Sequence, residues 1–288
     1  MFDIATYRVL FGLSFLIPSI LFALIHFILI VLIRKSTTLS TVPYYQCAIH
    51  VSITDAFQLL FNGLPTSFYL FYNSTSAFFV DKILGAILNS TFFVFIYFAA
   101  LIAFNRLCYI FCRRKTTVDR LFSERKMRFF VAMGWCQGLG FFVLYSFTEC
   151  TFRFSIDRLS FGYDEGHLSK IVQRLELIID SVYLVIMAAS YTLILIKLKI
   201  TNNRICSEII SSQVKKRKVE LRVLIQASIL CGMVTVTTTA FFGLPSLTNN
   251  RYCFLLINYL WIMTACANAC VLLVFNRCKF NRLIVENV

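Results

Sequence analysis

The chain has 288 residues, of which 59% are hydrophobic and only 15% are charged. A soluble domain carries about a quarter charged residues, so this composition excludes a water-soluble globular fold. The net charge of +14 would suit a nucleic-acid-binding protein, but the basic residues lie between apolar stretches and no zinc-finger or RNA-binding motif accompanies them, which argues against nucleic acid as a partner.

Seven apolar stretches reach the length of roughly 20 residues that a transmembrane helix needs. In chain order they are 11–33, 46–70, 83–104, 129–147, 178–198, 222–246 and 254–275. The first is too long for a signal-peptide core and lacks a small-residue cleavage site, so we expect it to remain as a span. The sequence therefore predicts an all-α membrane protein in which residues 1–288 form a single bundle of seven transmembrane helices.

The orientation of this bundle follows from the positions of Lys and Arg. The loops after the first, third and fifth spans, together with the C-terminal tail, hold 21 of the 28 basic residues. The positive-inside rule places these segments in the cytoplasm, so the N-terminus is expected outside and the C-terminus inside. The sequon Asn73-Ser74-Thr75 agrees, because it falls in the outer loop after the second span and predicts glycosylation of Asn73.

Three short motifs indicate a family. The third span ends in Asn105-Arg106-Leu107-Cys108-Tyr109, which resembles the acid–Arg–aromatic triplet of rhodopsin-like G-protein-coupled receptors, and its Asn-Arg form is similar to nematode serpentine chemoreceptors. The run 217–226, which enters the sixth span, and the run 274–277, which closes the seventh, resemble class x of that superfamily. The resemblance covers about residues 10–280.

This resemblance implies a function as well as a fold. It implies a rhodopsin-like receptor in the plasma membrane that binds a small-molecule ligand and activates a heterotrimeric G protein. Nematode relatives imply sensory cilia as the location. The alternative functions are a membrane transporter or a ligand-gated channel subunit. Internal repeats and broken helices, which are typical of transporters, are missing, and insect-type channel subunits have their N-terminus inside.

The sequence also departs from the rhodopsin-like pattern. The sixth span has no proline in its middle, since Pro245 lies near its outer end, and no proline follows Asn268 in the seventh. The outer end of the third span has no cysteine for the usual bridge to the second outer loop. Cys150 and Cys253 both lie outside in this topology, so they are the alternative pair for a disulfide.

Arg106 is the residue that most directly suggests a mechanism. Its planar guanidinium suits a carboxylate on a neighbouring helix, and Glu220 stands where the sixth span begins on the inner side. We expect the two to pair at rest and to separate on activation, when Asn105 and Arg106 would face the G protein. In the alternative interpretation Arg106 only extends to the lipid headgroups. The run Lys215–Lys218 is expected to contact anionic membrane lipids.

Asp55 is the only acid well inside the first three spans, and Asn268 lies at a similar depth in the seventh. Because a buried charge in a membrane usually has a partner, we expect the two to form an interior polar network, as an acid and an asparagine do in rhodopsin-like receptors. Alternatively, Asp55 is protonated and only joins two helices through a hydrogen bond.

The outer halves of the third, fifth, sixth and seventh spans supply aromatic and polar residues for a ligand pocket. The expected pocket residues are Phe92, Phe93, Asp180, Tyr183, Phe241, Phe242, Asn258 and Trp261. Asp180 could pair with a cationic ligand or lie at the level of the headgroups. No histidine has metal-ligand spacing and no acid stands in a protease motif, so we expect neither an enzyme nor a metal or other cofactor.

Overall fold

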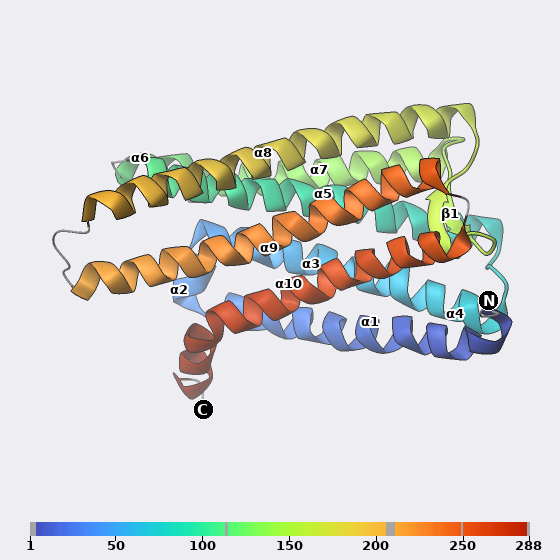
Figure 1. The fold of residues 1–288 in the computed structure, drawn as a ribbon, viewed down its shortest axis with the longest axis horizontal. Coiled ribbons are helices and arrows are strands. Elements are labelled where there is room, and N and C mark those ends of the chain that lie inside the picture. The colour runs from blue at the N-terminus through green and yellow to red at the C-terminus, as the bar shows by residue number, and fades with distance from the viewer. Residues whose placement is uncertain (1–3, 113–114, 206–210, 249, 287–288) are drawn as a thin grey trace.

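The structure is a computed structural model, which describes the backbone of residues 4–112, 115–205, 211–248 and 250–286. Side chains are described within these ranges except at 4–6, 115, 201–205, 211–224, 226–227, 246 and 275–286. The helices lie side by side as an elongated bundle, with the N-terminus at one end and the C-terminus at the other (Figure 1).

The elements follow one another as helices, with one pair of strands between the fourth and fifth long helical segments. They are α1 (Ile4–Lys35), α2 (Thr37–Ser40), α3 (Pro43–Gln58), the π-helical turn η1 (Leu59–Gly63), α4 (Leu64–Tyr72), α5 (Phe78–Phe111), α6 (Lys115–Leu121), α7 (Glu124–Phe147), β1 (Phe152–Ser155), β2 (Ser160–Tyr163), α8 (His167–Ile205), α9 (Ser211–Leu247) and α10 (Arg251–Glu286).

Six of the described helices are long and apolar enough, as uninterrupted segments, to cross a membrane; they lie in α1, α5, α7, α8, α9 and α10. The seventh membrane segment is the continuous helical stretch α3–η1–α4, which the π-helical turn divides into shorter pieces. Pro65 explains the turn, because it has no N–H to donate to the carbonyl of Phe61 and its ring crowds the preceding turn. Gly63 within the turn lies directly against Ser19, so α1 packs closely there.

Helix α5 is the centre of the bundle. It packs against α3, α7 and α8. In its most apolar segment of 18 residues, 83% is buried inside the protein, whereas the corresponding segments of the other five long apolar helices are 17–56% buried. Phe93, Phe95 and Phe98 are completely buried along it. The surrounding helices present apolar side chains outward, as Val185 and Phe147 do, and lipid rather than water suits such a surface.

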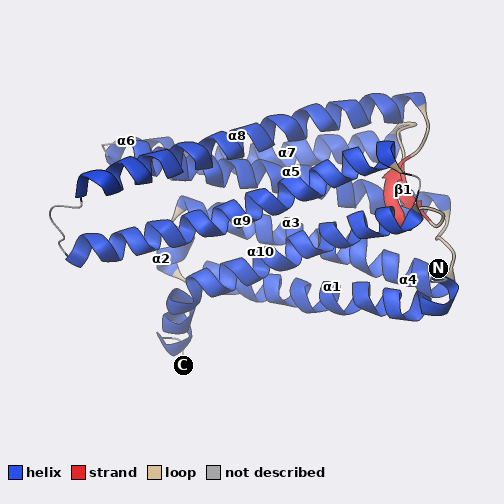
Figure 2. Ribbon diagram, in the orientation of Figure 1, coloured by secondary structure: helices blue, strands red, loops and turns tan. Residues whose placement is uncertain are grey.

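A short antiparallel hairpin adds to the expected all-α fold. Strands β1 and β2 pair with Phe152 opposite Tyr163 and Ser155 opposite Ser160, and they lie at the end of the bundle that carries the N-terminus (Figure 2). The hairpin packs on α5, α8 and α10. Gly85 of α5 allows the close approach, because a side chain there would meet the backbone oxygen of Phe152.

Candidate functional site

A small cavity lies in the half of the bundle nearest the hairpin, between α5, α8, α9 and α10. Its walls are Phe92, Glu176, Asp180, Thr237, Thr238, Phe241, Phe242 and Trp261. Five of these belong to the predicted pocket, and the sequence analysis missed Glu176 and the two threonines. The cavity volume is only about 10 Å³, which is close to the space that the centre of one water molecule needs. A larger ligand therefore requires side chains in the wall to move.

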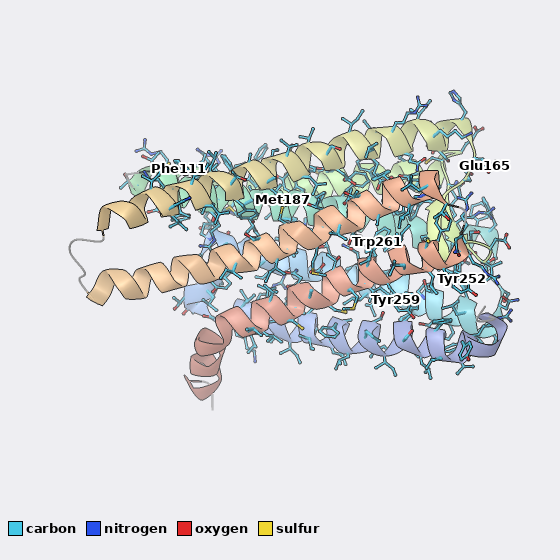
Figure 3. The ribbon with its side chains drawn as sticks, in the orientation of Figure 1. Phe111, Glu165, Met187, Tyr252, Tyr259 and Trp261 are labelled. Carbon is cyan, nitrogen blue, oxygen red and sulfur yellow. The ribbon has the colours of Figure 1, made fainter. Side chains whose placement is uncertain are left out.

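Four aromatic residues form the apolar part of the wall: Phe92, Phe241, Phe242 and Trp261. The Trp261 ring lies edge-on to Phe92, with centroids 5.4 Å apart, and edge-on to Phe241, with centroids 6.0 Å apart. In Figure 3, Trp261 lies further along α10 from the hairpin end than Tyr252 and Tyr259. Phe152 of the hairpin contacts both Phe241 and Trp261, so the hairpin covers this aromatic group from outside.

Two acids and the two threonines form the polar part of the wall. Glu176 and Asp180 are one turn apart on α8 and therefore point to the same side of the helix. Both are buried, with 1% and 0% of their surface exposed. The Glu176 carboxylate accepts hydrogen bonds from the Tyr163 hydroxyl of β2 and from Asn89 Nδ2, at 3.3 Å in the second case. Both carboxylate oxygens of Asp180 lack a hydrogen-bond partner among the described residues.

The sequence contained a signal for Glu176. It lies four residues before Asp180, which is the spacing of neighbours on one helix face. The predicted fifth span begins at residue 178, however, which leaves Glu176 in the preceding loop. Helix α8 begins at His167, which brings Glu176 into the bundle.

Two residues of the predicted pocket face α7 instead of the cavity. Phe93 stacks on Phe141, with ring centroids 3.6 Å apart, and the Tyr183 hydroxyl donates to Gln137 Oε1 at 2.7 Å. Neighbours in a helix point about 100° apart, so Phe92 reaches the cavity while Phe93 reaches the next helix. The spans and depths identified the correct region but not the face of each helix.

The structure brings Asp55 and Asn268 together deep in the bundle. The Asn268 side-chain amide donates to the Asp55 carboxylate, which is 1% exposed. His26 of α1 joins them: its Nε2 lies 3.8 Å from the Asp55 carboxylate and 3.1 Å from the carbonyl oxygen of Ala265. Sequence analysis did not select His26, because a single histidine in an apolar span gives no motif.

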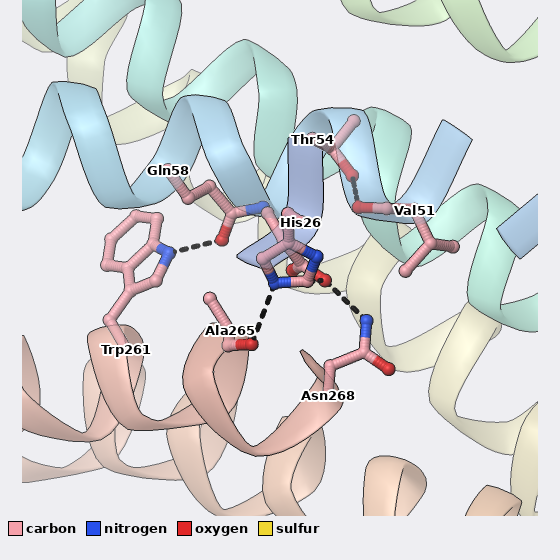
Figure 4. A network of polar contacts seen from close by, with 8 residues as sticks. His26, Val51, Thr54, Gln58, Trp261, Ala265 and Asn268 are labelled. Atoms are coloured by element: carbon pink, nitrogen blue, oxygen red, sulfur yellow. Dashed lines mark hydrogen bonds and ion pairs between the residues drawn. The ribbon is translucent and has the colours of Figure 1, made fainter. Parts of the chain in front are cut away.

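A second hydrogen bond connects α3 and α10 closer to the hairpin. Trp261 Nε1 donates to Gln58 Oε1 at 2.7 Å (Figure 4), and Gln58 is three residues from Asp55 on α3. One turn further out, Asn258 Nδ2 donates to Thr66 Oγ1 at 3.1 Å, so Asn258 belongs to this series of contacts and not to the cavity. Trp261 is the residue that touches both the cavity and the polar network.

At the opposite end of α5, the Arg106 guanidinium lies over the Tyr44 ring of α3, 4.1 Å from the ring centroid. Its neighbour Asn105 is 1% exposed, and both polar atoms of its side chain lack a partner among the described residues. The Glu220 side chain lies outside the described residues, so its pairing with Arg106 stays a prediction.

The suggested disulfide is not formed, since Cys150 and Cys253 are both free thiols. Cys150 is fully buried before β1, where its backbone N–H donates to Thr148 Oγ1 at 3.1 Å, and burial raises the pKa of its thiol to about 11. Cys253 lies in the first turn of α10. The two thiols belong to different elements, the segment before β1 and helix α10. Their expected placement on the same side of the membrane was not enough to predict a disulfide.

Comparisons with known proteins agree with this architecture. The crystal structure of squid rhodopsin superposes with a TM-score of 0.78 over 99% of this chain and 86% of the rhodopsin chain, at 18% sequence identity. This likeness shows the seven-helix fold alone, and no curated protein sequence matches the chain. The family model described as "Serpentine type 7TM GPCR chemoreceptor Srx" matches residues 17–276. The chain therefore belongs to the Srx family of serpentine seven-transmembrane G-protein-coupled chemoreceptors.

Proposed function

We propose that this receptor binds a small extracellular molecule in the cavity and, in response, activates a heterotrimeric G protein at the plasma membrane. The observation that carries the proposal is the double role of Trp261. Its ring lines the cavity, and its indole N–H donates to Gln58, beside the buried pair of Asp55 and Asn268. Occupation of the cavity and the packing of α3 against α10 are therefore physically connected.

The size of the cavity supports a change of conformation on binding. A volume of about 10 Å³ cannot hold an organic ligand unless wall side chains such as Phe241 and Trp261 move. A ligand shifts an equilibrium only by binding one conformation more tightly than another. A ligand that displaces the Trp261 ring favours conformations in which the bond to Gln58 is altered.

The cytoplasmic output is assigned to Arg106. Its guanidinium rests on the Tyr44 ring at the end of α5 opposite the cavity, and Asn105 beside it is a buried amide without a partner among the described residues. We propose that Glu220 pairs with Arg106 at rest and releases it on activation, so that it contacts the G protein. Lys215–Lys218 would hold the start of α9 near anionic headgroups.

Membership of the Srx family favours a receptor over the alternatives of a transporter or a ligand-gated channel subunit. The proposed location in sensory cilia rests on the nematode resemblance.

Asn73 is exposed in the loop after α4, at a left-handed backbone position with φ of 51°, where a glycosyltransferase could reach it. Asn73→Gln should abolish any glycosidase-sensitive change in mass, and a C-terminal epitope accessible on intact cells would contradict the orientation.

The proposal is tested by nucleotide exchange on a panel of Gα subunits, in membranes that contain the wild type or Glu220→Ala at equal surface levels. Release of Arg106 should raise basal exchange on at least one subunit. Glu124→Ala is the matched control, because this acid at the start of α7 is 81% exposed and its ion pair among the described residues is with Arg128, one turn away on the same helix. An equal rise in the control, or no rise with any subunit, would remove the proposed contact as the switch.

A further inference from the structure

The cavity contains an ionisable group that the packing of the protein does not explain. Asp180 is completely buried, yet neither of its carboxylate oxygens has a hydrogen-bond partner among the described residues. A buried carboxylate without a partner is costly, and ionisable residues inside a membrane are usually paired or functional. By contrast, Glu176 in the same wall is bonded to Tyr163 and Asn89.

The remaining walls favour one sign of charge. Among the residues that the structure describes, the lining of the cavity includes no Lys, Arg or His, and two of its members are acids. Phe92, Phe241 and Trp261 offer aromatic faces and edges around them. Aromatic faces attract organic cations through their quadrupole, whereas an anionic ligand would meet two carboxylates at short range.

We infer that the ligand of this cavity is a small organic cation, a protonated amine, whose ammonium group pairs with the Asp180 carboxylate inside the aromatic wall. This inference rests on the proposed function for the position of the site and adds the chemical class of the ligand. Glu176 adds negative potential, while its bond to Tyr163 ties the cavity to the hairpin.

The threonines of α9 add a second contact. The Thr237 hydroxyl is already bonded to the Thr264 hydroxyl at 2.9 Å, but the Thr238 hydroxyl lacks a partner among the described residues. An amine that also carries a hydroxyl or ether group would satisfy Thr238 as well as Asp180. The small size of the closed cavity limits the ligand to one that the rings of Phe241 and Trp261 can accommodate by rotating.

The test measures binding without a G protein. The purified full chain in nanodiscs is unfolded thermally in the presence of three probes of similar size: 2-phenylethylamine, the neutral 2-phenylethanol and the anionic 3-phenylpropionate. Only the amine should raise the midpoint of unfolding. Asp180→Asn keeps the shape of the side chain but removes the carboxylate. It should weaken amine binding by about 30-fold or more, since the buried ammonium group of the ligand then has no charged partner.

Asp81→Asn is the matched control. Asp81 is also a buried acid near the hairpin end, but it accepts a hydrogen bond from Tyr69 and does not line the cavity. It should bind the amine like the wild type. If Asp180→Asn fails to fold, Thr238→Val tests the same wall: it should remove any preference of the cavity for the hydroxylated analogue 2-amino-1-phenylethanol over 2-phenylethylamine.

Three results would overturn the inference: no stabilisation of folded wild-type receptor by the amine, equal stabilisation by 2-phenylethanol, or undiminished amine binding by Asp180→Asn. Because no G protein is present, this failure is distinct from failure of the proposed signalling. Amine binding without nucleotide exchange on any Gα subunit would support the cation site and contradict the signalling function.

Discussion

The hydroxyl of Tyr163 holds the hairpin to the helix bundle, so its removal should loosen the cover of the cavity. It donates to the Glu176 carboxylate, lies 2.7 Å from the Tyr145 hydroxyl and accepts from Asn89 Nδ2 at 3.1 Å. Tyr163→Phe removes these contacts and leaves the ring in place. The partners keep other bonds, because Asn89 still reaches both Glu176 and Tyr145.

The magnitude follows from these contacts. A hydrogen bond to a charged group contributes about 1.5–3 kcal/mol and a neutral one about 1 kcal/mol. Since Glu176 and Tyr145 are not left without partners, we expect Tyr163→Phe to weaken docking of the hairpin by about 2–3 kcal/mol. This corresponds to an increase of roughly 30- to 150-fold in the population with an undocked hairpin.

Hydrogen–deuterium exchange of the receptor in nanodiscs measures that population. Amides of β1 and β2 should exchange faster by this factor in Tyr163→Phe, while those in the middle of α5 keep their protection. Tyr109→Phe is the control, because its hydroxyl lies near the end of α5 opposite the hairpin and its hydrogen bond among the described residues is a long one, 3.5 Å from Asp119. Unchanged exchange in the strands would refute the role assigned to the Tyr163 hydroxyl.

Further predictions concern the same outer end. Gly85→Ala should lower the free energy of unfolding by about 1–3 kcal/mol, because its new methyl group meets the backbone of β1. Gly140 has open space around it, so Gly140→Ala should leave the free energy of unfolding unchanged or raise it by up to about 1 kcal/mol. Equal melting temperatures of the two variants would contradict this. Cys150, whose thiol pKa is raised to about 11 by burial, should resist maleimide at pH 8 while the exposed Cys112 reacts, as mass spectrometry can show. Burial and the nearby Glu176 carboxylate raise the pKa of the Tyr163 phenol above its ordinary value of 10. The contribution of its O–H to docking should therefore be constant between pH 8 and 10 and be lost only above that range. Loss of strand protection between pH 8 and 10, corrected for intrinsic exchange, would disagree.

Hydropathy and the distribution of basic residues were sufficient to predict the seven-helix fold, because lipid imposes long apolar segments that are visible in the sequence. The depth of Asp55 and Asn268 likewise suggested a contact, and the structure brings them together. These predictions depend on position along the membrane normal, which residue number gives directly at 1.5 Å per residue.

Features that depend on rotation about a helix or on local backbone geometry were not predicted. Phe93 and Tyr183 were placed in the pocket because depth alone does not fix the helix face. The hairpin was missed because its two strands have four residues each within a polar loop, and Glu176 because the apolar stretch begins after it. The π-helical turn leaves no signal in hydropathy, although Pro65 marks the weakened hydrogen bond.

The central claim, that this chemoreceptor activates a G protein through Arg106, is tested most directly by nucleotide exchange with purified receptor in nanodiscs. Glu220→Ala and the double variant Glu220→Ala/Arg106→Ala are compared on the Gα subunit that responds best, with correct folding checked by thermal unfolding. The account predicts that the single variant raises exchange above the wild type and that loss of Arg106 abolishes the increase. Full exchange by the double variant, or none by any variant on any subunit, would contradict it.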